Sequence, residues 1–240
     1  MKTVFIAFYL AIVPALLLAE TTVTVLDVTG NVQVRYGIDE IWHAVTPGLI
    51  LRDIDTIMTG EEAEIILKLS DGRRFVLSGN STLDIADLRT IMQKELFLYL
   101  TTQKIKRIEL PEGKRNLRMG DVSIVHGSKK NADSTDNDSS SANLWIPEFN
   151  GALALHVQKF FPNAVVKLHK ILEKYGMVKD SQKIYFYIAK SLEAMNLDGQ
   201  AIDAYQFVVD HVELSDSPDE EARKRAAEAR KAIKRLRTKG

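Results

Sequence analysis

The spacing of apolar residues changes along this chain, and the change falls at a polar stretch that cannot form a core. Residues 127–143 read GSKKNADSTDNDSSSAN and contain almost no apolar side chains. Such a composition buries too little surface to offset the entropy lost on ordering. The stretch predicts a flexible polar linker at 127–144, which divides the 240 residues into two parts with different periodicity.

The part before the linker has the pattern of an all-β domain, predicted at 20–126. It consists of short runs rich in Val, Ile, Leu and Thr that are separated by Gly, Asp or Asn, which is typical of strands. The runs are TVTVLDVTG, VQVRYG, EIILKLSDG, FVLSGNS, LFLYL, KIKRIEL and VSIVHG.

The run Ile65–Leu77, IILKLSDGRRFVL, reads as a β-hairpin with its turn at Asp71-Gly72. A two-residue turn places Leu69 opposite Arg74. A turn one residue longer places Leu69 opposite Phe75 and puts the apolar residues of both strands on one face, so it is the favoured register.

The part after the linker, 145–240, has helical spacing and predicts an all-α domain. Two stripes follow the i, i+3, i+4, i+7 rule, and antiparallel helices joined near Asn196–Gly199 would bury them against each other. The stripes are Tyr185, Ile188, Ala189 and Leu192, then Ala201, Ile202, Tyr205 and Val208. Equivalent alanines recur 37 positions apart, which indicates a helical repeat.

A last helix is predicted from Ser217 onward, with Ser217 as N-cap, Pro218 as the first helical residue and Glu220 in a capping box. Its thin apolar side suits a terminal capping helix. Its many basic residues favour a solvated face, and the alternative is a contact with a membrane surface or a polyanion.

Residues 1–19 have the form of a secretory signal peptide. Lys2 precedes an apolar run from Val4 to Leu18, and Ala19 precedes the polar Glu20. A run of ~15 apolar residues is short for a membrane span, so we expect cleavage after Ala19 and no stable span afterwards. The alternative is an uncleaved anchor.

The helical part resembles the tetratricopeptide repeat family. Its resemblance rests on Ala189, Leu192, Ala201, Tyr205 and Val208, where small and large packing residues alternate as in that family. The match is weaker before Tyr175, where the first helix has Gly151 in place of a larger residue. The resemblance implies helical hairpins that mediate protein–protein interaction.

The β part resembles the FecR-like periplasmic domain. The motifs that carry this resemblance are Gly30-x-Val32, Trp42, Pro47-Gly48, Leu51-Arg52-x-x-Asp55-Thr56-Ile57-x-Thr59-Gly60, Asp71-Gly72 and Ser81-x-Leu83-x-Ile85. This chain has Ile54 where the family has glycine. The resemblance implies a β-domain outside the inner membrane of a bacterium. No cytoplasmic segment precedes the apolar run, so the family's contact with a sigma factor is not expected here.

Catalytic motifs are not found in the sequence. The five histidines lack metal-ligand spacing, no serine lies in GxSxG or SxxK, and there is no P-loop or dinucleotide fingerprint. Asp53 and Asp55 are more typical of a solvated pair beside a turn than of a general acid and base. We therefore expect a non-enzymatic protein with no catalytic residues, no metal and no cofactor.

A protein-binding surface is predicted on the helix that contains Tyr185. If the apolar stripe faces inward, Lys183, Phe186, Lys190 and Glu193 project into the groove of the repeat. The alternative is that Phe186 packs on the helix of the preceding repeat. Trp42 has two readings as well: a residue of the sheet core, or an exposed platform for a sugar.

The sequence predicts an α+β protein of two domains, β first and helical second. The expected function is that of an exported binding or scaffold protein of a bacterial cell envelope, in the periplasm, at the cell surface or secreted. We expect an envelope protein as partner and no nucleic acid, since the formal net charge is zero. The alternatives are a glycan or peptidoglycan recognition module, and a signalling component that acts through a separate membrane partner.

Overall fold

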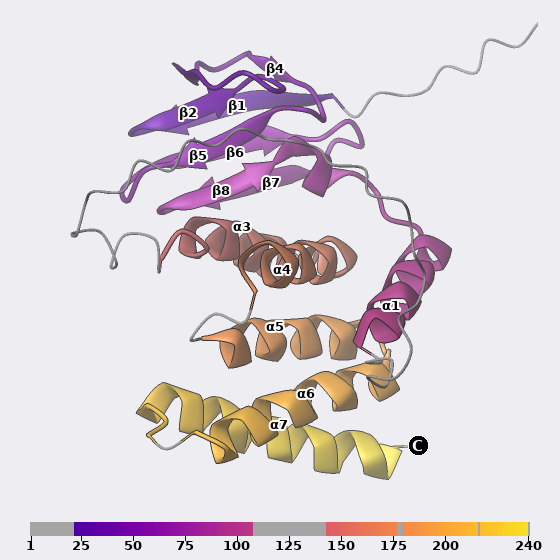
Figure 1. Ribbon diagram of the computed structural model, residues 1–240. Helices are drawn as coiled ribbons and strands as arrows, with labels where there is room; N and C mark the ends of the chain where they lie inside the picture. The colour runs from indigo at the N-terminus through magenta and orange to yellow at the C-terminus, as the bar shows by residue number, and fades with distance from the viewer. Residues whose placement is uncertain (1–21, 108–142, 177–179, 216, 240) are drawn as a thin grey trace, which may run out of the picture.

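The computed structural model describes residues 22–107, 143–176, 180–215 and 217–239 (Figure 1). Strands occupy the first part of this chain and helices the rest, so the fold is α+β. The strands are β1 (Val23–Thr29), β2 (Val32–Arg35), β3 (Trp42–Ala44), β4 (Ile50–Leu51), β5 (Thr56–Thr59), β6 (Glu64–Lys68), β7 (Arg74–Ser78) and β8 (Ser81–Asp84). The 3-10 turn η1 (Ile85–Leu88) precedes the helices α1 (Gln93–Arg107), α3 (Ile146–Val157), α4 (Phe161–Tyr175), α5 (Ser181–Ala194), α6 (Asp198–Glu213) and α7 (Glu220–Lys239).

The strands form two antiparallel sheets of four strands each. Their orders are β4-β1-β6-β7 and β3-β2-β5-β8, so β7 and β8 are edge strands. Alternate residues of the strands point into one core, as the predicted alternation requires: Ile65 and Leu67 of β6 and Phe75 and Leu77 of β7 have no exposed surface.

The β6–β7 hairpin has a register that differs from both predicted registers. Leu67 pairs with Phe75, and the N–H of Leu69 donates to the carbonyl of Arg73 at 2.9 Å. The turn therefore spans 70–72, and Gly72 at its end has φ +84°, a left-handed conformation that favours glycine. The apolar residues still share one face because the shift keeps buried positions opposite one another.

The run LFLYL, predicted as a strand, lies inside helix α1, so the segment 20–126 is not all-β. Its residues have helical as well as alternating spacing: Leu96, Tyr99, Leu100 and Gln103 follow i, i+3, i+4, i+7, and a short apolar run does not distinguish the two. Leu96 and Gln103 are buried against the helices. The run KIKRIEL begins within α1, while its end and VSIVHG lie outside the described residues.

The helices α5 and α6 pack as predicted. Tyr185, Ile188, Ala189 and Leu192 are buried, as are Ala201, Tyr205 and Val208 on α6, whereas Ile202 is only partly buried. Ala189 of α5 and Ala201 of α6 are fully buried in the same apolar cluster.

Helix α7 begins at Glu220 rather than at Ser217. The carboxylate of Asp219 accepts a hydrogen bond from the N–H of Ala222 at 2.6 Å, so Asp219 fills the N-cap role predicted for Ser217. The apolar side of α7 is buried, as predicted from the sequence; it contains Ala222, Ala226, Ala229, Ile233 and Leu236.

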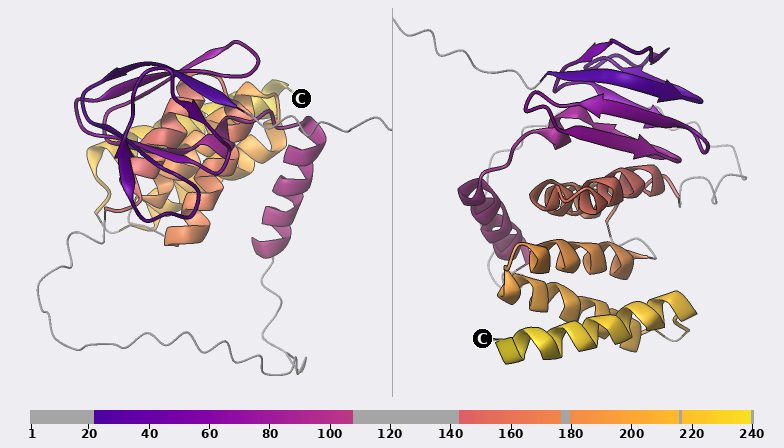
Figure 2. Two further views of the ribbon diagram at one scale, coloured as in Figure 1. Left: turned by 90° about the horizontal axis from the view of Figure 1, so that it is seen from above. Right: turned by 180° about the vertical axis from the view of Figure 1, so that it is seen from behind.

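The elements stack in layers (Figures 1 and 2). The β-sandwich lies at one end, α3 and α4 come next, α5 follows, and α6 and α7 form the other end. Helix α1 runs along the side of this stack. The predicted signal peptide at 1–19 lies outside the described residues, as does the linker apart from 143 and 144. No helix within the described ranges has the length and apolar character needed to span a bilayer.

Helix α3 packs directly on the edge strands of the sandwich. Leu155, Phe160 and Ala164 belong to the same buried apolar cluster as the strands. A Cβ atom on Gly151 would lie 2.2 Å from the carbonyl oxygen of Thr82, so only glycine permits this approach. The contact with the β-sandwich explains the glycine at position 151 of the first helix, and the strands share one buried apolar cluster with Leu155, Phe160 and Ala164.

Candidate binding groove

The predicted binding residue Phe186 is not exposed. Its side chain is 5% exposed and belongs to the core of the helical part, with its ring centroid 6.1 Å from that of Tyr205. The prediction that Phe186 projects into an open groove is therefore wrong. The reason is that Phe186 packs with Tyr205 of α6, while α7 lies against the same helix α5.

The three polar residues predicted with Phe186 contact other parts of the chain. Lys190 forms an ion pair with Glu228 of α7 at 3.3 Å, and Glu193 pairs with Arg235 of α7. The ammonium of Lys183 lies 4.7 Å from the centre of the Phe149 ring on α3. Neighbouring helices thus occupy much of the surface on which a partner was expected.

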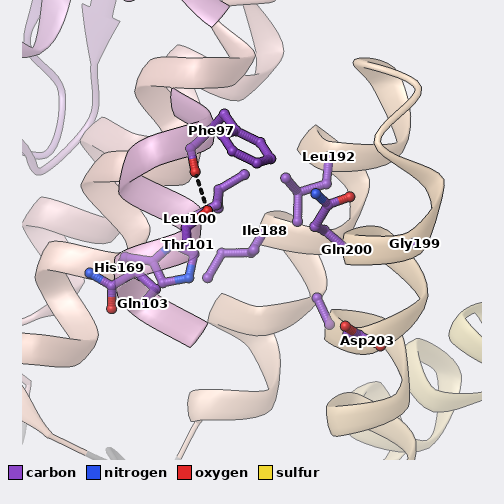
Figure 3. Close-up of a pocket in the computed structure, with 11 residues that line it drawn as sticks. Phe97, Leu100, Thr101, Gln103, His169, Ile188, Leu192, Gly199, Gln200 and Asp203 are labelled. Carbon is purple, nitrogen blue, oxygen red and sulfur yellow. Dashed lines mark hydrogen bonds between the residues drawn. The ribbon is translucent and has the colours of Figure 1, made fainter. Parts of the chain in front are cut away.

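An apolar groove of about 480 Å³ lies elsewhere, between α1 and the helices α4, α5 and α6. Figure 3 shows Phe97 and Leu100 of α1 facing Leu192 across this groove. The residues that line it are Phe97, Leu100, Thr101, Gln103, His169, Ile188, Leu192, Gly199, Gln200, Asp203 and Ala204. We call this set the α1 groove.

Helix α1 is held at one wall of the groove by contacts with α4. The amide of Gln103 donates to the Glu173 carboxylate at 2.8 Å, and the Tyr99 ring meets the His169 ring edge to face at 5.8 Å. Burial and the nearby Glu173 carboxylate raise the pKa of Tyr99 above its usual value, so this phenol stays neutral at physiological pH. These contacts fix the wall from which Phe97 projects.

The rim of the α1 groove carries an aromatic residue and a carboxylate. Phe97 is 59% exposed although it stands over an apolar floor. Asp203 is exposed and forms no ion pair with the residues that the structure describes. The neighbouring Leu98 has a similar exposure, 56%, but does not line the groove. The site therefore offers apolar contact area with one free negative charge.

Trp42 lies at a second, polar cleft of about 640 Å³ between the β3-β2-β5-β8 sheet and helices α3 and α4. It is half-buried, and the Arg35 guanidinium lies 5.4 Å from the centre of its ring. Several charged residues of this cleft pair with each other, for example Lys174 with Glu148 at 2.6 Å. Trp42 therefore lines the cleft with a partly exposed ring, opposite Arg35 on the neighbouring strand β2.

A buried ion-pair cluster joins the sandwich to α4. The ammonium of Lys167, 2% exposed, lies 3.0 Å from Asp84 and 2.8 Å from Asp87. Burial opposes its charged form, but the carboxylates of Asp87 and Asp84 outweigh burial and raise the pKa of Lys167. Lys170 also reaches Asp87, at 3.0 Å. Because each charge is paired, we interpret the cluster as a clamp between the two parts.

The carboxylates considered as an acid–base pair have structural contacts. Asp55 is buried and accepts hydrogen bonds from the N–H groups of Arg52, at 2.8 Å, and Gly37, at 3.2 Å, whereas Asp53 is exposed. Within the described ranges, no group of three or more histidine or acidic side chains is arranged to hold a metal ion.

Sequence reasoning missed the α1 groove because Phe97 and Leu100 were placed in a strand. The helical spacing that starts at Leu96 was the available signal. Comparison with protein-family models, with curated proteins and with solved structures finds no match to this chain.

Proposed function

We propose that the protein is an exported, non-enzymatic binding or scaffold protein of a bacterial cell envelope, and that the α1 groove binds an apolar segment of a protein partner. The β-sandwich acts as a FecR-like domain that holds the tetratricopeptide-like helices and α1 in place. The partner thus binds in the α1 groove rather than at the surface of Lys183, Phe186, Lys190 and Glu193 on α5.

The exposure of Phe97 carries the proposal. This large aromatic side chain is 59% exposed beside a groove of about 480 Å³. A partner that covers it would stabilise the complex by roughly 25 cal/mol per Å² of apolar surface removed from water. Aromatic residues beside an apolar floor are also the residues that dominate protein interfaces.

Asp203 restricts the chemistry of the partner. A rim carboxylate that pairs with no cation among the described residues favours a basic residue in the bound segment, because charge complementarity selects partners and orients them. We therefore expect a segment with two or more apolar side chains and one Lys or Arg, bound from α1 to the beginning of α6.

Selection from a random peptide library tests this proposal. Peptides enriched on the purified protein should be apolar with a basic residue, and Phe97→Asp should weaken their binding by tenfold or more, since a loss of about 1.4 kcal/mol corresponds to tenfold. Leu98→Asp is the matched control, because it introduces the same charge at an equally exposed neighbouring position outside the groove. Equal losses in both variants, or no loss in either, would contradict the proposal.

A reversed charge tests the role of the rim. Asp203→Lys should weaken the selected basic peptides, and an acidic version of the same peptide should regain affinity for Asp203→Lys. If affinity does not depend on the sign of either charge, Asp203 does not recognise the partner.

Recognition of a glycan is the second candidate function, and the half-buried Trp42 in the polar cleft favours it. Binding to purified peptidoglycan, compared between the wild type and Trp42→Ala, tests this function. Loss of wall binding with an unchanged melting temperature would support it.

Export is part of the proposal and rests on residues 1–19. The mass of the protein purified from a bacterial envelope fraction should correspond to cleavage after Ala19. A mass that includes Met1 to Leu18 would contradict cleavage.

A further inference from the structure

The two ends of the stack carry opposite charge. Residues 22–92, which contain the β-sandwich, have eleven acidic and six basic residues, whereas α6 and α7 at the other end together have seven acidic and nine basic residues, and all nine of these basic residues lie on α7 (Figure 1). The formal net charge of the whole chain is zero. The sandwich end is therefore acidic and helix α7 is basic, which favours contact between these two surfaces of different molecules.

At the acidic end, the loop between β2 and β3 presents two isoleucines around two carboxylates, in the order Ile38-Asp39-Glu40-Ile41. Ile38 is 100% exposed and Ile41 is 67% exposed. The N–H of Asp39 donates to the carbonyl of Tyr36 at 3.0 Å, which closes the turn. Neither carboxylate forms an ion pair with a residue that the structure describes. Isoleucines so exposed at a turn indicate a contact surface.

At the basic end, a groove of about 380 Å³ lies between α6 and α7. Val209 and Ile233 form its apolar part, and Arg230, Lys234 and Arg237 supply three cations. Arg230 pairs with Glu213 at 2.7 Å, while Lys234 and Arg237 form no ion pair within the described part of the chain. This groove is separate from the α1 groove.

We propose that the loop Ile38–Ile41 of one copy of this chain docks in the α6–α7 groove of a second copy. The isoleucines would contact Val209 and Ile233, and the two carboxylates would face Lys234 and Arg237. Within one molecule the loop and the groove belong to opposite ends of the stack, so the contact forms only between molecules. Because it joins two different surfaces, it adds further copies head to tail.

The association is expected to be weak and sensitive to salt. A single loop in a groove buries far less than a standard interface, and solvent-exposed ion pairs are screened at high ionic strength. Sedimentation velocity at rising protein concentration should show species larger than the monomer at low salt, and these should disappear at about 0.5 M salt.

Charge-reversed variants test which surfaces meet. The loop variant is Asp39→Lys with Glu40→Lys, and the groove variant is Lys234→Glu with Arg237→Glu. Each variant alone should associate at least about tenfold more weakly than the wild type, because like charges then face each other. An equimolar mixture of the two should regain association, since each loop then finds a groove of opposite charge in the other variant. All substituted residues are exposed, so the melting temperatures should stay close to the wild type.

Three results would overturn the inference. The wild type could remain monomeric at millimolar concentration in low salt, the loop variant could associate as strongly as the wild type, or the mixture could fail to regain association. A monomeric wild type whose α6–α7 groove binds a synthetic peptide of the sequence Ile-Asp-Glu-Ile would assign the groove to an acidic segment of another protein and would exclude self-association.

Discussion

Gln158 and Val76 form two hydrogen bonds across the junction between helix α3 and edge strand β7. The backbone N–H of Val76 donates to the Gln158 side chain at 2.8 Å, and the side-chain amide of Gln158 donates to the carbonyl of Val76 at 2.7 Å. The glutamine therefore takes the place of a neighbouring strand at the edge of the sheet. Edge strands with unpaired backbone groups associate with other chains, so the helical part protects the sandwich that carries it.

Gln158→Ala should destabilise the protein by about 1–3 kcal/mol, because it leaves two backbone groups of Val76 without partners. The free energy of unfolding from urea titration measures this loss. Gln206→Ala is the control, since the Gln206 side chain donates an exposed hydrogen bond to Asp210 on its own helix and its loss should cost less than about 0.5 kcal/mol. Similar losses for both variants would mean that Gln158 does not pair the strand edge.

Gly151→Ala should destabilise the protein, because the new Cβ would lie 2.2 Å from the carbonyl oxygen of Thr82. Overpacking of this kind costs about 1–3 kcal/mol. Gly199→Ala is the matched control: this helical glycine has no atom within 4 Å of the added Cβ, and the change should stabilise the protein by up to about 1 kcal/mol. If Gly151→Ala is as stable as the wild type, α3 does not approach β8 as closely as described.

Lys167→Met should cost about 3 kcal/mol at neutral pH, since it leaves the buried Asp87 with Lys170 alone. Burial raises the pKa of Asp84, but Lys167, Thr56 and Lys170 together lower it by more, so the net shift is downward. Asp84 therefore stabilises the fold above its unfolded pKa of about 3.9, and this contribution is lost as the pH falls through the lower folded value. The raised pKa of Lys167 adds stability that is present below about pH 10.4 and lost as the pH rises through its folded value.

The stability difference between the wild type and Lys167→Met should thus be largest between about pH 5 and pH 9 and should shrink in strong acid. Chemical denaturation at a series of pH values measures it. A difference that does not change down to pH 2 would show that the Lys167–Asp84 contact contributes nothing.

Phe186→Ala should lower the free energy of unfolding by about 3–5 kcal/mol, because its side chain is in the core of the helices. Phe97→Ala should cost much less, since Phe97 is 59% exposed. The melting temperatures of the two variants measure the difference between a core aromatic residue and an exposed one at the proposed binding site. If the Phe186→Ala variant has the same melting temperature as the wild type, Phe186 is not a core residue and belongs to the binding surface that the sequence predicted.

The sequence alone predicts an element correctly where the local spacing of apolar residues agrees with their burial in the fold. Alternation along β6 and β7, and the stripe that contains Tyr185 and Leu192, predicted the correct elements because each buries one face only. The helix α1 was missed because its apolar run fits two periods. The contacts of Gly151 with Thr82 and of Gln158 with Val76 join positions far apart in the chain, and no local pattern encodes them. For the same reason, the cover that α7 provides over α5 was not predicted.

The position of a bound peptide tests the central claim most directly. Hydrogen exchange of the backbone should be compared with and without a peptide selected on the wild-type protein. We predict slower exchange in α1 around Phe97–Gln103 and in α6 around Gly199–Ala204, with no change in α7. Protection confined to α7 or to the β-sandwich, while the peptide remains bound, would contradict the assignment of the α1 groove as the binding site.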